Sequence, residues 1–304
     1  MNTQDLKDLV RDKYSTIASQ DKATNASSCC GAGGCSDQTY NIMNEDYSTL
    51  EGYAPDADLG LGCGLPTLSA GIRPGDTVLD LGSGAGNDCF VARRATGADG
   101  RVIGVDFTPP MIEKARQNNA ALGYQNVEFR QGEIEDLPLS DCMVDVVLSN
   151  CVLNLVPDKR KAFGEVMRVL RPGGHFSISD VVLARELPKG LRDAAELYAG
   201  CVSGAIPEKD YLGIIHDLGF AEVTVEKRRP IVIPDDILAN YLDQDGITAY
   251  RNAGDAIMSI TVTGRKPETG CCAPKTRALP KEELKTDPEG THAIPGCDLG
   301  TACC

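Results

Sequence analysis

The chain has 304 residues, of which 42% are hydrophobic, and a formal net charge of −14 at pH 7. It is long enough to bury the core of one large domain or two modest ones. The acidic balance repels phosphate backbones and disfavours nucleic acid as a partner, and no apolar run reaches the length of a membrane span. The polar N-terminus lacks the apolar stretch of a signal peptide. We therefore expect a cytoplasmic, monomeric protein with a small-molecule ligand.

The predicted elements alternate between helices and short apolar strands. Residues 4–19 are predicted as an amphipathic helix whose apolar face holds Leu6, Leu9, Val10, Tyr14 and Ile17. A polar, glycine-rich loop follows over 20–57. Strands are then expected at 77–82, 101–106, 126–131, 144–149, 174–182, 221–228 and 256–266, with helices between them at 109–121, 158–170 and 207–218. This alternation predicts an α/β fold with a mainly parallel sheet and helices on both faces.

Thirteen cysteines and only three histidines are spread along the chain. A reducing cytosol keeps thiols from pairing, so a large and odd number of them indicates metal or metalloid binding, or thiol redox chemistry. Three histidines are few for zinc sites that combine cysteine and histidine ligands. The tail beyond residue 267 holds five of the cysteines, lacks periodicity, and is predicted to be flexible.

The first glycine cluster, "LGLGCG" (59–64), has no strand before it. A short helix is expected after it, with Pro66 at its first position and Gly71 at its end. Cys63 would lie near the start of that helix, where the partial positive charge favours a thiolate. The alternative is a cysteine packed as a small apolar side chain, although the flanking glycines leave little apolar surface for such packing.

The second cluster, "LDLGSGAGND" (79–88), follows a strand and opens a helix, which is the context of a cofactor loop. Gly82, Gly84 and Gly86 let the backbone approach a ligand closely, and the helix start offers unpaired N–H groups. The next strand ends in Asp106, whose carboxylate can accept hydrogen bonds from both hydroxyls of a ribose. These features predict a nucleoside-containing cofactor and do not by themselves exclude NAD.

Two more cysteines stand in turn-like settings. "VLSNCVLNL" places Cys151, after Asn150, just past the fourth strand, at the carboxyl edge of the sheet where open α/β folds bind ligands. "LYAGCVSGAIP" places Cys201 in a turn of small residues. Each cysteine alone is more often structural, but together with Cys63 they indicate a thiol site.

The segment "VLDLGSGAGND" resembles motif I of the class I S-adenosylmethionine methyltransferases. Three further segments resemble the same family: "VIGVDFTPPMIEKAR", "GEIEDLPL" and "LRPGGHFSISD". The resemblance implies a Rossmann-like sheet of seven mostly parallel strands, and S-adenosylmethionine as the cofactor. The residues that it implies for the cofactor site are Asp80, Gly82, Gly84, Gly86, Asp106, Phe107, Met111, Gly132, Ile134, Glu135 and Asn150.

The cysteine segments resemble a narrower family. "LGLGCGLP", "SNCVLNL" and "AGCVSGA" are similar to motifs of the arsenite S-adenosylmethionine methyltransferases. This resemblance implies that Cys151 and Cys201 hold trivalent arsenic at the mouth of the cofactor pocket. It also implies that Cys63 pairs with a cysteine of the N-terminal segment. Cys29, Cys30 and Cys35 are the candidates; we favour Cys35 and keep Cys30 open.

The chemistry that these resemblances imply is methylation of arsenite and of methylated trivalent arsenicals. Soft thiolates suit a soft arsenic centre, so Cys63, Cys151 and Cys201 are expected as arsenic ligands. Positioning of two bound reactants would then supply most of the catalysis, and no general base is required. Transfer leaves the arsenic formally oxidised, so a thiol pair that includes Cys35 would reduce it, and thioredoxin or glutathione would reset the thiols.

We divide the chain accordingly into four parts. These are an N-terminal helix and Cys-rich loop (1–57), an adenosylmethionine-binding Rossmann-like domain (58–185), a smaller α+β portion that completes the sheet and the arsenic site (186–266), and the Cys-rich tail (267–304). Two alternative functions stay open: methylation of another small molecule such as a quinone or sterol precursor, and thiol-based metal binding or redox sensing on a methyltransferase scaffold.

Overall fold

The computed structural model describes residues 3–20, 45–192 and 204–268. Its seven strands are β1 (Thr77–Leu81), β2 (Arg101–Asp106), β3 (Val127–Gln131), β4 (Val144–Asn150), β5 (Leu170–Leu183), β6 (Ala221–Pro230) and β7 (Ile257–Arg265). The longer helices are α1 (Thr3–Ala18), α4 (Asn87–Thr96), α5 (Pro109–Leu122), α6 (Lys159–Val169), α9 (Glu208–Asp217) and α11 (Gln244–Asn252). Short helical turns are η1 (Pro55–Ala57), α3 (Pro66–Ser69), η2 (Leu153–Leu155), α7 (Lys189–Arg192) and α10 (Asp235–Leu238). The predicted strands and helices are confirmed, with ends shifted by a few residues.

All seven strands join one sheet in the order β3-β2-β1-β4-β5-β7-β6. The pairs from β3 to β5 are parallel, whereas β7 runs antiparallel to both β5 and β6. The predicted mostly parallel sheet is therefore confirmed. The strand order reverses between β1 and β4, and open α/β sheets bind ligands beyond the carboxyl ends of the strands at such a point.

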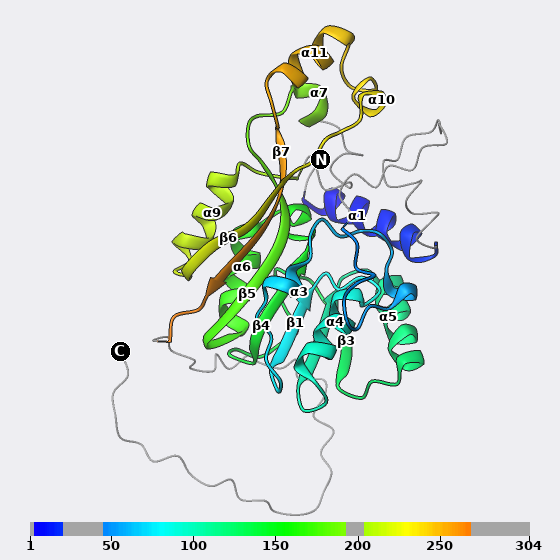
Figure 1. Ribbon diagram of the computed structural model, residues 1–304, viewed down its shortest axis with the longest axis vertical. Helices are drawn as coiled ribbons and strands as arrows, with labels where there is room; N and C mark the ends of the chain where they lie inside the picture. The colour runs from blue at the N-terminus through cyan, green and yellow to red at the C-terminus, as the bar shows by residue number, and fades with distance from the viewer. Residues whose placement is uncertain (1–2, 21–44, 193–203, 269–304) are drawn as a thin grey trace, which may run out of the picture. The chain divides into compact units, whose positions relative to one another are not determined.

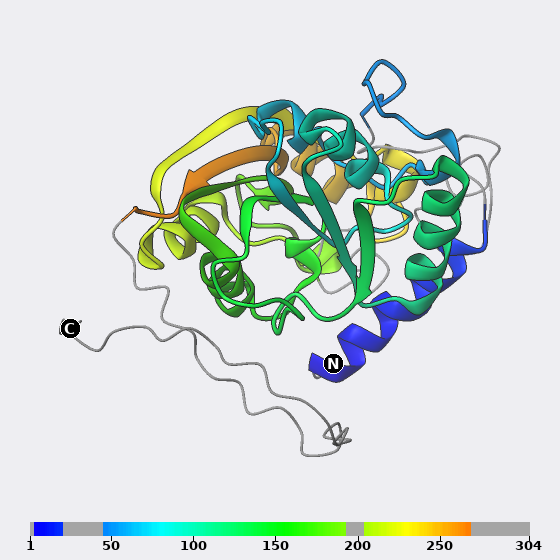
Figure 2. The same ribbon diagram turned by 90° about the horizontal axis from the view of Figure 1, so that it is seen from below.

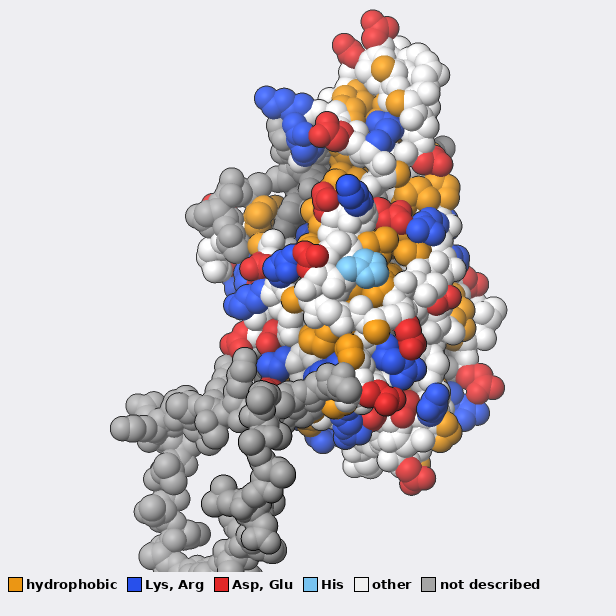
Figure 3. All heavy atoms as spheres, turned by 90° about the vertical axis from the view of Figure 1, so that its left-hand side faces the viewer, with side chains coloured by type: hydrophobic (Ala, Val, Ile, Leu, Met, Phe, Trp, Pro, Cys, Tyr) orange, Lys and Arg blue, Asp and Glu red, His pale blue; other side chains and the backbone are white. Residues whose placement is uncertain are grey.

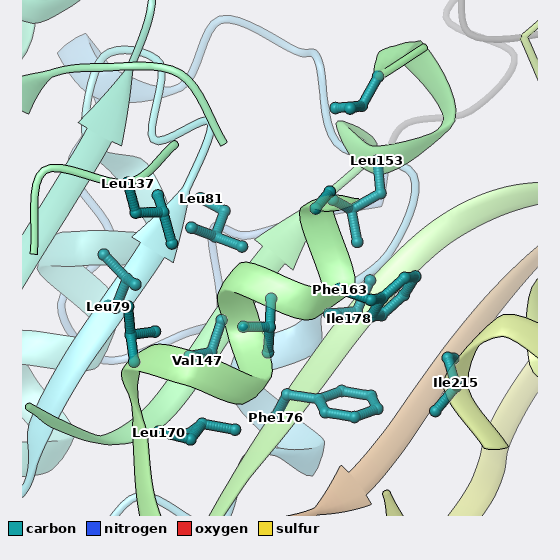
Figure 4. Close-up of a cluster of buried hydrophobic side chains, with 14 of the residues drawn as sticks. Leu79, Leu81, Leu137, Val147, Leu153, Phe163, Leu170, Phe176, Ile178 and Ile215 are labelled. Atoms are coloured by element: carbon teal, nitrogen blue, oxygen red, sulfur yellow. The ribbon is translucent and has the colours of Figure 1, made fainter. Parts of the chain in front are cut away.

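Helices cover both faces of this sheet because alternate strand residues point to opposite sides. Leu79 and Leu81 of β1 belong to a core cluster with α6 and α9, and Val78 belongs to another with α4 and α5. Figure 4 shows the first cluster, in which Phe163 of α6 meets Phe176 of β5 with ring centroids 6.0 Å apart. Strands buried on both faces explain the near-continuous apolar runs in the sequence.

A third apolar cluster lies around α7, α10 and α11, next to the end of β5 and the start of β7. Leu191, Leu238 and Ile257 are among its fully buried members, and so is Cys63. Figure 1 shows these three helices gathered at one end of the sheet. This cluster supplies the apolar surroundings of two candidate arsenic-binding thiols.

Helix α1 packs against α5, and the two helices lie next to each other, with their axes crossing, in Figures 1 and 2. Val10 and Ile17 of α1 are buried, whereas Leu6 and Leu9 are only partly covered. The N-terminal helix thus extends the layer formed by α4 and α5. All described residues belong to one compact unit, Met1–Ala273, and the boundaries expected at 57, 185 and 266 stay predictions.

Strand β6 forms one edge of the sheet, and its outward side chains are mostly charged. Lys227 and Arg228 pair with Glu45 and Glu208 at 2.7 Å. Figure 3, which faces this side of the molecule, shows positive and negative side chains mixed over the surface. Charged side chains on an edge strand oppose pairing with another sheet. Within the described ranges, no helix is both long and apolar enough to cross a bilayer.

Candidate functional site

The loop after β1 adopts a conformation that requires its glycines. Gly82, Gly84 and Gly86 have φ angles of 68°, 51° and 100°, in the left-handed region that glycine adopts without strain. A Cβ atom on Gly82 would lie 2.6 Å from a methyl carbon of Val152, which follows β4. The loop therefore passes close to the end of β4, at the point where the strand order reverses.

Asp106 ends β2 beside this loop, and its carboxylate is held by backbone groups. Its Oδ2 accepts a hydrogen bond from the Gly84 N–H at 3.0 Å, and its Oδ1 accepts one from the Thr108 N–H at 2.8 Å. Burial raises the pKa of Asp106, while these N–H donors act in the opposite direction. A carboxylate offers about four acceptor positions, so its remaining lone pairs are available to the hydroxyls of a ribose.

A cavity extends from this point along the carboxyl edge of the sheet. Of the predicted cofactor residues, its lining includes Asp80, Gly82, Gly84, Asp106, Phe107, Gly132, Ile134, Glu135 and Asn150. Met111 and Gly86 are not among the lining residues. Met111 belongs to the first turn of α5 and is fully buried in the core, and Gly86 precedes α4 and packs closely against Phe90 and Phe129. The role of Met111 and Gly86 in a cofactor site stays a prediction.

Two further carboxylates lie buried in the cavity wall. Burial raises the pKa of Asp88 to about 6, although hydrogen bonds from Asn150 and Tyr47 lower it in part. Burial also raises the pKa of Asp80 well above its usual range, with the nearby Asp88 adding to the effect. The Cys89 thiol donates a hydrogen bond to Asp80 Oδ2 at 3.3 Å. Cys89 thus supports the cofactor end of the site.

The loop 59–64 is fastened to the end of β4 by the side chain of Asn150. Its Oδ1 accepts hydrogen bonds from the Cys63 N–H at 3.0 Å and the Gly64 N–H at 3.3 Å. Its Nδ2 donates to the Gly64 carbonyl at 2.9 Å and to Asp88 Oδ2 at 3.2 Å. The amide predicted to bind the cofactor therefore has both its ends engaged by protein groups.

The two glycines that flank Cys63 make this contact possible. A Cβ on Gly62 would lie 2.8 Å from Asn150 Nδ2, and a Cβ on Gly64 would lie 2.6 Å from Ser179 Cβ of β5. From the other side, Ser259 Oγ donates a hydrogen bond to the Cys63 carbonyl at 2.6 Å. The first glycine cluster is thus a packing loop that seats Cys63 between β4 and β7.

Cys63 itself is completely buried, and Cys151 is 3% exposed. Both belong to the apolar cluster around α7, α10 and α11. The expectation that the glycines leave Cys63 little apolar surface to pack against is therefore wrong, because the surface comes from distant elements. Helix α3 has only four residues, so hydrogen bonds rather than its dipole dominate the placement of the loop.

Cys151 has a positive φ of 60°, which is uncommon for a residue with a side chain. The Cys151 N–H donates a hydrogen bond to the Ser179 carbonyl at 2.8 Å, which holds this backbone in place. Cys151 also lines the cavity, next to Asn150 and Val152. Unfavourable backbone conformations that persist in this way concentrate at functional sites. The other predicted thiols, Cys35 with its alternatives Cys29 and Cys30, and Cys201, lie outside the described residues.

Comparison of the sequence with those of known proteins shows the family of the chain. A family model described as "Methyltransferase domain" matches residues 72–229. An arsenite methyltransferase of Halobacterium salinarum is 42% identical over 278 residues, which cover 87% of this chain and 67% of that protein. The chain belongs to the arsenite methyltransferase family.

Two other relatives agree with this family. An arsenite methyltransferase of Aquipseudomonas alcaligenes is 34% identical over 78% of this chain and 68% of its own length. The crystal structure of an arsenic(III) S-adenosylmethionine methyltransferase from Chlamydomonas reinhardtii superposes with a TM-score of 0.59 at 37% identity, over 69% of each chain. The predicted class I methyltransferase fold is thereby confirmed.

Several residues of the chain reach the cavity from outside the matched domain. They are Lys7, Val10 and Tyr14 of α1, Tyr47, and a group between Ala57 and Gly62. Sequence reasoning missed Lys7 and Tyr47 because they carry no motif, whereas Leu59, Leu61 and Gly62 belong to the glycine segment 59–64. Tyr47 shows the consequence: its hydroxyl donates to Asp88 and contacts the amide of Asn150. The only available signal was the apolar face of the first helix, which predicted packing but no partner.

Proposed function

We propose that this protein transfers the methyl group of S-adenosylmethionine to trivalent arsenic held by cysteine thiolates. The observation that carries the proposal is the link through Asn150, whose side chain binds the Cys63 loop while its neighbour Cys151 lines the cavity beside the glycine loop. Under this proposal a thiol site and a nucleoside site share one wall of the cavity. Catalysis then consists mainly of holding two reactants in a productive orientation.

The cavity fits S-adenosylmethionine in its donor set. The carboxylate of Asp106 would accept hydrogen bonds from the ribose. The apolar side chain of Ile134 would pack on a face of the base, and Glu135 would accept a hydrogen bond at its edge. Ser83 Oγ and Asn87 Oδ1 are buried in the cavity wall and have no hydrogen-bond partner within the described part of the chain. Buried polar atoms usually have partners, so these two favour a polar ligand in this place. When bound, S-adenosylmethionine supplies an electrophilic methyl group on a sulfonium.

The thiols bind arsenic by exchange with its hydroxyl groups. Each Cys thiol gives its proton to an arsenic-bound hydroxyl, which leaves as water while an As–S bond forms. We assign this role to Cys63, Cys151 and Cys201. No general base is needed, because arsenic donates a lone pair and carries no proton on it. The apolar surroundings of Cys63 and Cys151 keep competing water away from the As–S bonds.

Methylation removes two electrons from the arsenic centre formally, so a reductant must restore it. A pair of cysteine thiols supplies these electrons and becomes a disulfide, and we assign Cys63 and Cys35 to the pair. An external thiol system, thioredoxin or glutathione, then reduces the disulfide. Under this proposal the protein works as a monomer in the cytoplasm, where such reductants are present.

A product assay tests the function. Full-length protein is incubated with arsenite, a dithiol and S-adenosylmethionine carrying a labelled methyl group, and the products are separated by chromatography with arsenic detection. We expect the label in methylated arsenic. A parallel reaction with a reduced quinone in place of arsenite tests the alternative substrate. Label in the quinone and none in arsenic would overturn the proposal, and label in neither would favour a thiol-binding role.

A further inference from the structure

Helix α1 closes one side of the cavity although it lies outside the methyltransferase domain. Lys7, Val10 and Tyr14, which are spaced by one helical turn, line the cavity from this helix. The far end of α1 is fastened to α5, because Lys114 Nζ donates hydrogen bonds to the carbonyls of Ala18 at 3.1 Å and Gln20 at 3.3 Å. The helix is thus a built part of the site wall.

Lys7 makes a bridge between two carboxylates at this wall. Its Nζ lies 2.6 Å from Glu133 Oε2 and 2.5 Å from Glu135 Oε2. Burial alone would lower the pKa of Lys7, but its hydrogen bonds to Glu133 and Glu135 outweigh this effect and raise it. The side chain of Glu135 is only 9% exposed and that of Lys7 is 20% exposed. Such a partly buried pair is screened less by water than a surface pair.

The second oxygen of Glu135 is also held. Its Oε1 accepts a hydrogen bond from the Asp158 N–H at 3.2 Å, at the start of α6. The carboxylate is therefore oriented from two sides, by α6 and by α1. Each oxygen keeps a further lone pair, because a carboxylate offers about four acceptor positions.

Lys7 is the one lysine or arginine among the described residues that line the cavity. Six carboxylates share that lining: Asp58, Asp80, Asp88, Asp106, Glu133 and Glu135. Without Lys7, the charges of Glu133 and Glu135 would repel each other, and Glu135 would remain nearly buried without its cation. A buried charge that loses its ion-pair partner costs free energy, so the Glu135 carboxylate would turn toward solvent.

The geometry points to Lys7 as a positioning residue for the methyl donor: it orients Glu135 so that this carboxylate accepts a hydrogen bond from the adenine amino group. Glu135 follows β3, the strand next to β2, and so lies one strand beyond the ribose-binding Asp106. An acceptor-only side chain in this part of the cavity matches an exocyclic amino donor. The inference rests on the proposed use of the cavity for S-adenosylmethionine.

Binding of S-adenosylhomocysteine to the full-length protein, measured by titration calorimetry, tests the assignment without requiring turnover. We expect Lys7→Met to raise the dissociation constant about tenfold, the scale of one charge-assisted hydrogen bond. Lys7→Arg, which keeps the cation, should recover most of the affinity. Lys209→Met removes the same charge from an exposed position at the start of α9 and should bind as the parent does.

An analogue separates positioning from general support of the fold. S-inosylhomocysteine presents a carbonyl in place of the amino group, so it faces the Glu135 carboxylate with an acceptor. The parent protein should prefer the adenosine compound, and Lys7→Met should lose much of that preference. A variant that weakens both compounds equally, or neither, would overturn the assignment.

The possible failures can be told apart. If the parent protein does not bind S-adenosylhomocysteine, the proposed function itself fails. If the parent binds it and Lys7→Met binds it equally well, only the role of Lys7 fails. Thermal unfolding checks each variant, and Lys7→Gln, which keeps a hydrogen-bond donor without the charge, replaces Lys7→Met if that variant does not fold; the same loss of base preference is expected.

Discussion

Asp106 and Asn150 both stand at the end of a buried parallel strand, yet the structure uses them differently. Asp106 lines the cavity, and neighbouring backbone N–H groups, among them those of Gly84 and Thr108, hold its carboxylate. The side-chain amide of Asn150 is hydrogen-bonded to the Cys63 loop and to Asp88. A position at the carboxyl edge of the sheet therefore indicates that a residue belongs to a ligand site. Its hydrogen bonds then show whether its side chain faces the ligand or holds a loop in place.

The first prediction concerns Asp106. Asp106→Ala should weaken binding of S-adenosylhomocysteine by about 1.5–3 kcal/mol, because hydrogen bonds to a charged acceptor are lost. Titration calorimetry on the full-length protein measures the change. Asp99→Ala, at an exposed position before β2, is the matched control and should bind normally. Unchanged affinity in a folded Asp106→Ala variant would remove this residue from the ribose site.

Asn150 leads to a different expectation. Asn150→Ala removes four hydrogen bonds from the Cys63 loop and Asp88, so Cys63 should lose its fixed position. We expect the affinity for arsenite to fall about tenfold or more, the scale of losing one or two buried hydrogen bonds, with a smaller effect on S-adenosylhomocysteine. Both affinities can be measured by calorimetry on one preparation. Equal losses for the two ligands would contradict a role centred on the thiol loop.

At the scale of elements, the strands and helices could be predicted because their apolar periodicity is local. The glycine loop after β1 was predicted for the same reason, since strand, loop and helix follow each other directly. The packing of the Cys63 loop is harder to predict from the sequence, because the loop is held by Asn150, which is 87 positions away. Lys7 and Glu133, 126 positions apart, lie beyond any local pattern. Contacts between residues that only the tertiary fold brings together produce no periodic pattern in a single sequence.

Close packing of the Cys63 loop gives an element-scale prediction. In Gly64→Ala the new Cβ would lie 2.6 Å from Ser179 Cβ, so the loop or β5 must shift. We expect slower arsenic methylation and a lower melting temperature, with binding of S-adenosylhomocysteine largely retained. Gly164→Ala, in α6 with open space around its Cβ, is the control and should be neutral or slightly stabilising. A Gly64→Ala protein with parental stability and rate would show that the loop is not tightly packed.

For the whole molecule, buried carboxylates couple stability to pH. Burial raises the pKa of Asp180 to about 7 from an ordinary 3.8, against the Val181 N–H, Lys159 and the Tyr211 hydroxyl, which lower it. The folded state therefore holds this proton more tightly than the unfolded state. The resulting stabilisation is complete below about pH 4 and is lost as the pH rises through 7.

Asp180→Asn tests this coupling, because the amide resembles the protonated acid and does not titrate. The parent's free energy of unfolding should decline between about pH 4 and pH 7. The free energy of unfolding of the variant should decline less, and its remaining decline comes from Asp88, Asp80 and Asp106, whose pKa values burial also raises. Denaturant unfolding at several pH values measures both curves. Identical pH dependence in the two proteins would show that Asp180 is ionised at neutral pH.

The central claim is that arsenic is methylated while Cys151 holds it beside the methyl donor. The most direct measurement is product analysis of Cys151→Ser and Cys63→Ser with arsenite and with monomethylated trivalent arsenic, after binding of S-adenosylhomocysteine has shown that each variant keeps its cofactor site. Serine offers a hard, poorly ionised oxygen in place of a soft thiolate, so Cys151→Ser should methylate neither substrate. Cys63→Ser should fail with arsenite, which uses three thiols, and retain activity on the monomethylated substrate, which uses two. Methylation of the monomethylated substrate by Cys151→Ser at the parental rate would contradict the account.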